Sequence, residues 1–226
     1  MAQKFWFKLD NAAKLYPAIA NRSWMSMFRL TAELDENVDP QVLQSALDDT
    51  IRRFPTMNVR LRAGLFWYYL EEVPARLLVR PDEGHPCMPF SSKRDGSFLF
   101  RVFYFGKRIS TEFFHVLTDA SGGLAFLKTL TVRYLQLMGH DVSFDQGALD
   151  ITTPPTEEET QDAFLKIPLP KIRIDRSIEK AYHFPATREI PHTLNIIAAS
   201  MPCDRLLQNA REMKVSLTEY LTALML

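Results

Sequence analysis

The chain has 226 residues, of which 46% are hydrophobic, with 27 basic and 27 acidic side chains. A chain of this length can bury a substantial core, either as one large domain or as two small ones. The balanced charge excludes the strong global field that draws proteins to nucleic acids or anionic membranes, so no nucleic-acid partner is expected.

Cysteine usage and hydropathy restrict the class further. Cys87 and Cys203 are far apart and lack the spacing of a metal site, which fits a reducing compartment and predicts no bound metal. No hydrophobic run reaches the length of a membrane span, and the N-terminus has no apolar signal-peptide region. The composition therefore predicts a soluble, cytoplasmic α/β protein with no membrane span.

Strand and helix signals alternate in the first part of the chain. Residues 5–9 are predicted to form a short strand, and residues 16–17 and 21–23 to be turn or loop. Residues 27–34 alternate apolar and polar side chains, which is typical of a half-buried strand. Residues 39–54 are predicted to be a helix, because they begin with an Asp-Pro pair that suits the N-cap and the first helical position.

Short strands separated by turns follow this helix. They are predicted at 57–62, 65–70, 76–80, 98–105 and 109–116. The first two pair as a hairpin around Gly64, and the last two pair as a hairpin around Gly106. The segment 81–95 holds four turn signals and is predicted to be a loop. The last strand delivers His115.

A helical period begins after Asp119. Apolar residues recur at helical spacing from Leu124 to Met138, and Gly139 suits a C-cap. The predicted local architecture is therefore strand, tight polar turn, helix. It places Asp119 near a helix N-terminus, where backbone N–H groups favour negative charge.

The remaining chain is less regular. Residues 140–191 form a predicted crossover or lid with a short helix at 157–165. A strand at 193–201 and a helix at 204–213 follow, and a weak capping box at 216–219 precedes a last apolar helix. Because the sequence stops inside that helix, it is interpreted as a fragment whose C-terminal half is absent.

His115 is the candidate catalytic residue. A histidine titrates near neutral pH, so at the end of a strand that faces a cleft it can act as a general base. Asp119, four positions later, can fix the turn by capping the helix or by pairing with an arginine. By itself a His-x-x-x-Asp pattern is weak, since an aspartate before a helix is more often a plain N-cap.

The other titratable candidates have simpler interpretations. Cys87 has no basic neighbour in sequence to lower the pKa of its thiol, so no reactive cysteine is expected. The remaining histidines lack partners at ligand spacing and are interpreted as surface or loop residues: His85, His140, His183 and His192.

The stretch 115–123, His-Val-Leu-Thr-Asp-Ala-Ser-Gly-Gly, resembles the His-His-x-x-x-Asp-Gly signature of the chloramphenicol-acetyltransferase-like superfamily. The closest resemblance is to its alcohol acetyltransferase group. The preceding elements also come in a similar order, and the helix 39–54 ends in Arg-Phe-Pro. The resemblance spans most of the chain. It implies an α/β fold, a sandwich of a mixed, largely antiparallel sheet with flanking helices.

The resemblance also implies roles for single residues. His115 matches the signature's second histidine, which is the general base, and Asp119 matches the aspartate that organises the loop by pairing with an arginine. Two positions depart from the signature. Phe114 replaces the first histidine, which is not the base. Ala120 replaces the glycine, and alanine fits poorly if the turn needs a positive φ there.

The resemblance implies an acyl-CoA-dependent O-acyltransferase with no bound cofactor. Acyl-CoA would be the co-substrate, a small alcohol-like molecule the acceptor, and the absent half of the protein the other wall of the channel, so the fragment alone is expected to be inactive. The expected parts are an N-terminal subdomain at 1–139, the crossover or lid at 140–191 and the start of a second subdomain at 192–226. Two alternatives stay open: a non-catalytic binding or scaffold relative, and a condensation domain acting on carrier-protein thioesters.

Overall fold

The structure, a computed structural model, describes residues 6–21, 25–90, 95–162 and 196–225, and the single residues Lys166, Lys180 and Pro185. The chain divides into two compact units, Met1–Pro185 and Ala186–Leu226. Each unit is described by itself.

A four-stranded sheet forms the centre of the first unit. Its strands, in spatial order, are β2 (Met27–Glu33), β7 (Arg108–Phe114), β6 (Phe100–Phe105) and β5 (Arg80–Pro81). β7 pairs antiparallel with both β2 and β6, and β5 lies parallel to β6. The alternation of residues 27–34 makes one face of β2 apolar. Phe28, Leu30 and Ala32 pack on the core, as the sequence predicts.

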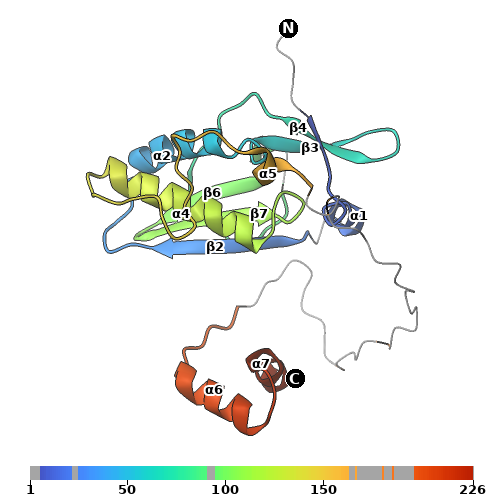
Figure 1. Cartoon of the computed structure of the whole chain (residues 1–226), viewed down its shortest axis with the longest axis vertical. Coiled ribbons are helices and arrows are strands. Elements are labelled where there is room, and N and C mark those ends of the chain that lie inside the picture. Colours follow the sequence, from blue (N-terminus) through green and yellow to red (C-terminus); the bar gives the residue numbers. More distant parts are fainter. Residues whose placement is uncertain are drawn as a thin grey trace. The chain divides into compact units, whose positions relative to one another are not determined.

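Two helices cover that apolar face, α2 (Pro40–Arg53) and α4 (Ala120–Leu137), and they lie side by side (Figure 1). The Asp39 side chain caps α2 by accepting hydrogen bonds from the N–H groups of Gln41 and Val42. Three phenylalanines fill the space between helices and sheet with stacked and edge-to-face contacts: Phe100, Phe113 and Phe126.

A second, three-stranded antiparallel sheet has the order β1 (Trp6–Lys8), β4 (Tyr68–Glu72), β3 (Val59–Ala63). Val59 and Leu70 of this sheet contribute to a separate core cluster. Phe114, at the end of β7, belongs to the same cluster. Adjacent residues of β7, Phe113 and Phe114, therefore point into different cores, because successive side chains of a strand face opposite ways.

Charged side chains occupy the other face of the four-stranded sheet. Glu112 is 1% exposed and accepts hydrogen bonds from Arg29, from Arg101 and from the backbone N–H of Cys87. Burial opposes the charge on Arg29, but its bonds to Asp82 and Glu112 prevail and raise its pKa. A buried carboxylate needs such partners, so this network satisfies charge on the face that the helices leave open.

The first unit also contains two short helices, α1 (Leu15–Ile19) and α5 (Glu157–Thr160). The second unit contains α6 (Cys203–Glu212) and α7 (Leu217–Met225). The predicted capping box is present. Ser216 N–H donates to the Glu219 carboxylate, and Glu219 N–H donates to the Ser216 hydroxyl. Among the described residues, no helix has both the length and the hydropathy that a bilayer span requires.

The α/β class with a largely antiparallel sheet and flanking helices is confirmed, although the strands divide between two sheets. The main helices, the 27–34 strand and the hairpin around Gly106 lie where the sequence predicts them. The three-part domain organisation stays a prediction.

Several local predictions were wrong. Residues 16–17 belong to α1 and not to a loop. The Asp10 carboxylate accepts a hydrogen bond from Ala13 N–H and turns the chain, and Pro17 is tolerated in the first turn of a helix. The predicted strand at 65–70 is displaced to 68–72, because Gly64 N–H bonds to the Trp67 carbonyl and makes Leu65, Phe66 and Trp67 the exposed hairpin tip.

Two further segments are shorter than predicted, and a third forms no strand in its described part. Of the strand expected at 76–80, only Arg80 pairs with a neighbour. The helix expected at 157–165 ends at Thr160, and residues 163–165 lie outside the described part of the chain. Residues 196–201 form no strand, and Ile197 is 95% exposed, since this segment has no strand partner among the described residues; residues 193–195 lie outside them.

Candidate functional site

The turn after β7 carries His115. β7 ends at Phe114, one residue before the histidine, but the pairing continues because the His115 N–H donates to the carbonyl of Ser26 (2.8 Å). Phe114 and Val116, on either side, are buried in the second core cluster. The backbone of His115 is therefore fixed from both directions, while its side chain is half-buried.

The imidazole of His115 lies against two aromatic rings. The ring of Tyr16 stacks on it with centroids 4.5 Å apart and an interplanar angle of 15°. Phe28 meets it edge-on at 5.2 Å. Among the described residues, none makes a hydrogen bond with the side chain of His115.

Asp119 is the N-cap of α4. Its exposed carboxylate accepts a hydrogen bond from the N–H of Gly122 (2.9 Å), and its backbone is extended with φ −89°. The resemblance implied an arginine partner, but within the described ranges no arginine is paired with this carboxylate. Asp119 therefore stabilises the turn through the helix terminus.

Ala120 is compatible with the turn. It is the first residue of α4 and is not among the non-glycine residues with positive φ. The two glycines that follow are required for space instead. A Cβ on Gly122 would lie 2.2 Å from the Thr118 hydroxyl, and a Cβ on Gly123 would lie 2.9 Å from the Phe28 ring.

A cavity of about 480 Å³ opens beside His115. The turn 115–119 lines one part of it, α1 and the chain before it line another with Asp10 and Tyr16, and the segment around α5 contributes Glu159 and Gln161. This volume lies in the range of small-molecule sites. The cavity thus brings an imidazole together with carboxylate, phenol, hydroxyl and amide groups from three separate parts of the chain.

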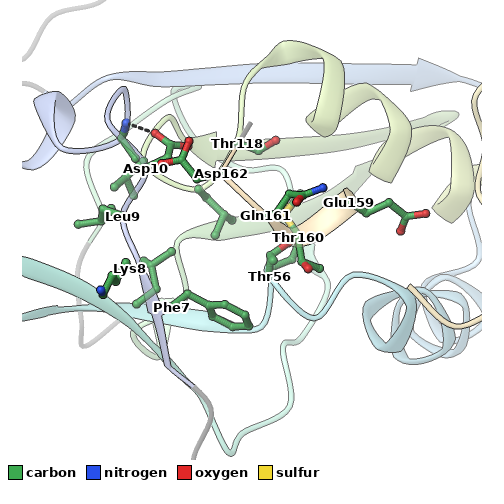
Figure 2. Close-up of a pocket in the computed structure, with 15 residues that line it drawn as sticks. Phe7, Lys8, Leu9, Asp10, Thr56, Thr118, Glu159, Thr160, Gln161 and Asp162 are labelled. Carbon is green, nitrogen blue, oxygen red and sulfur yellow. Dashed lines mark hydrogen bonds between the residues drawn. The ribbon is translucent and has the colours of Figure 1, made fainter. Parts of the chain in front are cut away.

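A second cavity, of about 200 Å³, shares the residues around Thr118 and Gln161 with the first. Figure 2 shows its lining, with Thr118 on one side and Phe7 and Lys8 of β1 on the other. A third cavity of about 230 Å³ also includes Thr118 and Glu159, and it extends to Arg53 at the end of α2. Thr118 therefore lines all three cavities.

The segment around α5 is held to the rest of the unit by Arg53. This arginine, 6% exposed, donates two hydrogen bonds to the Glu159 carboxylate and one to the Asp150 carbonyl. The hydrogen bonds from Arg53 lower the pKa of Glu159 below its usual range. The wall that contains Glu159 and Gln161 is consequently anchored by a charge pair and not by apolar packing, since α5 has no buried residue.

The other candidates lie elsewhere. His85 and His140 are exposed and line different cavities, and His183 and His192 lie outside the described residues. Burial, and after it the Glu112 carboxylate, raises the pKa of the Cys87 thiol, so it remains protonated at neutral pH. Within the described ranges, no three His, Cys, Asp or Glu side chains come together as a metal site requires.

The sequence predicts His115 and Asp119 as site residues, and it does not predict that Tyr16, Glu159 and Gln161 line the same cavity. Tyr16 was not predicted, because a Tyr-Pro pair is typical of a loop and gives no indication of the helix α1. Glu159 belongs to a run of three glutamates that is most simply a solvated helix start, and no local pattern marks which of the three pairs with Arg53.

No protein-family model and no curated protein matches the sequence. Solved structures do match in fold. The SgcC5 protein from Streptomyces globisporus is 16% identical, with a TM-score of 0.46, and the match covers 60% of this chain and 38% of that one. The starter condensation domain of rhizomide synthetase RzmA is 12% identical, with a TM-score of 0.48, and the match covers 62% of this chain and 40% of that one.

A third match, polyketide synthase associated protein 5 from Mycobacterium tuberculosis, is 14% identical with a TM-score of 0.43. It covers 61% of this chain and 33% of that one. The chain is similar in fold to part of each of these three structures. It matches about a third to two fifths of the length of each of them.

Proposed function

We propose that this chain carries the general base of an acyltransferase, and that His115 is that base. The observation that carries the proposal is the position of the imidazole, which is half-buried on the wall of a cavity of about 480 Å³ at the junction of β7 and α4. The spacing to Asp119 matches the acyltransferase signature, and the cap that Asp119 makes gives it a positional role. A general base has to reach a substrate proton, and a cavity wall allows this.

In the proposed reaction, His115 takes the proton from the hydroxyl of an acceptor. The acceptor oxygen attacks the thioester carbonyl of the donor, and a carbon–oxygen bond forms. The carbon–sulfur bond then breaks, and the proton held by the imidazole passes to the departing sulfur. The products are an ester and a free thiol, so the reaction balances without an oxidant or a reductant.

The proposed donor is acyl-CoA and the proposed acceptor is a small alcohol or related nucleophile. The hydroxyl of Thr118 and the amide of Gln161 offer hydrogen bonds to an acceptor in the cavity next to His115. The superfamily that the sequence resembles closes its channel with a second subdomain. We therefore propose that the complete channel needs a partner wall of that kind, so we expect the 226-residue chain alone to be inactive.

The test measures release of free thiol from a panel of acyl-CoA donors and simple alcohols, with the 226-residue chain and with the longest protein that its gene encodes. His115→Ala should lower turnover by about 10²- to 10⁴-fold, the usual contribution of a positioned base. His140→Ala is the matched control, because His140 is exposed and does not line the His115 cavity. Full activity in folded His115→Ala would reject the proposal.

Two outcomes of the same panel would point elsewhere. Turnover only with acyl groups attached to a carrier protein would favour a condensation domain. Silence with every donor, in the longest protein and with His115 intact, would favour a non-catalytic relative that keeps the fold.

A further inference from the structure

The backbone and the side chain of His115 are held by different means. The strand hydrogen bond to Ser26 and the buried neighbours Phe114 and Val116 fix the backbone. The imidazole contacts the rings of Tyr16 and Phe28, and it makes no hydrogen bond with any of the described residues. Many catalytic histidines are oriented by a hydrogen bond from the second ring nitrogen. Here, the ring of Tyr16 lies nearly parallel to the imidazole.

Tyr16 is itself held in place. It lies in α1, where its carbonyl accepts a hydrogen bond from the N–H of Ala20 (3.1 Å), and it packs on the second core cluster. The chain before it is turned by the bond between Asp10 and the N–H of Ala13 (2.6 Å). Pro17, the next residue, is buried. Tyr16 is therefore a fixed surface against which the imidazole can rest.

The geometry points to Tyr16 as a positioning residue for His115. We propose that its ring restricts the imidazole to the orientation seen beside the cavity, which both residues line. Its π face also favours the imidazolium that forms once the base has taken a proton, because a cation is attracted to the face of an aromatic ring. This inference rests on the proposed function, since it assigns Tyr16 a part in that same proton transfer.

The kinetic test compares Tyr16→Phe, which keeps the ring, with Tyr16→Leu, which removes it. Tyr16→Phe should keep kcat within about twofold. Tyr16→Leu should lower kcat by about 3- to 30-fold with little change in KM, the range that a lost aromatic and cation–π contact supplies. Tyr68→Leu is the control, because Tyr68 is an exposed tyrosine of β4 that lines no part of the His115 cavity.

A spectroscopic measurement separates this inference from the proposed function. A ring stacked on the imidazole shifts its proton resonances upfield, so Tyr16→Leu should move the His115 resonances downfield and Tyr16→Phe should not. If the longest protein that the gene encodes shows no turnover with any donor, the proposed function fails. If the wild type is active and folded Tyr16→Leu keeps full kcat, the role of Tyr16 is overturned while that function stands. Should Tyr16→Leu fail to fold, Tyr16→Met keeps the apolar bulk without a ring and decides in the same way.

Discussion

Arg53 donates two hydrogen bonds to the carboxylate of Glu159, from Nη1 (2.5 Å) and Nη2 (2.8 Å), across 106 positions of sequence. Arg53 is in the last turn of α2, and Glu159 lines the His115 cavity. The pair therefore connects the helical layer of the unit to the segment that lines one part of the cavity wall.

We expect Glu159→Gln to lower the free energy of unfolding by about 1 kcal/mol at pH 7, a value reduced for the 34% exposure of the Glu159 side chain. The pKa of Glu159 is lowered in the folded state, so its contribution is present above the unfolded pKa of about 4.3 and is lost as the pH falls through the folded value. The difference between wild type and variant should thus shrink below about pH 4.

Urea unfolding at pH 7 and at pH 3 measures this difference. Glu158→Gln is the matched control, since Glu158 is an exposed residue of the same short helix with no ion pair among the described contacts. Equal effects of the two variants at pH 7 would mean that the pair with Arg53 adds nothing.

Asp119→Ala should cost about 1 kcal/mol of stability, because α4 loses its N-cap, and Asp119→Asn should recover most of that loss. Thermal or urea unfolding measures both. Asp39→Ala removes the cap of α2 and should cost a similar amount without altering turnover, since Asp39 does not line the cavity. A large loss in Asp119→Asn would show that the carboxylate charge has a partner beyond the helix terminus.

Gly123→Ala should destabilise the protein by about 1–3 kcal/mol although alanine favours helix. The added Cβ would lie 2.9 Å from the ring of Phe28 and 3.1 Å from the ring of Phe113, which is fully buried. Gly84→Ala is the control, because a Cβ there meets nothing within 4 Å, and its effect should stay within about 0.5 kcal/mol. A stable Gly123→Ala would mean that β2 and α4 can separate without cost.

Phe114→His, which restores the first histidine of the signature, should lower stability by about 2–4 kcal/mol, since Phe114 is 2% exposed in an apolar cluster. Burial disfavours the charged form, so the pKa of the introduced imidazole falls below its unfolded value of about 6.5. Stability is then lost as the pH falls below about 6.5, and the deficit should be larger at pH 5 than at pH 8. Phe114→Leu should show no such pH dependence in the same unfolding measurements.

Periodicity was enough to predict the elements that bury a face. β2 shows alternating apolar residues, and α2 and α4 show apolar residues at helical spacing, because each element buries one face. Asp39 and Asp119 cap the helices that they precede. Such signals are local, so a sequence contains them in full.

The strands that were predicted wrongly depend on partners far along the chain. β5 is defined only by its pairing with β6, and the hairpin tip at 65–67 exposes residues that look like strand core. For the same reason, only part of the candidate site could be predicted from the sequence. His115 is recognisable from its neighbours in sequence, whereas Tyr16 and Glu159 reach the cavity through α1 and through Arg53.

The opposed directions of Phe113 and Phe114 have a mechanical consequence for the residue that follows them. One ring is locked in the layer beneath α2 and α4, and the other in the cluster of the three-stranded sheet. His115 is attached directly to the point where these two packed layers share a single strand. If one layer slid over the other, the end of β7 between them would rotate. The orientation of the His115 imidazole would then change together with the relative position of the two layers.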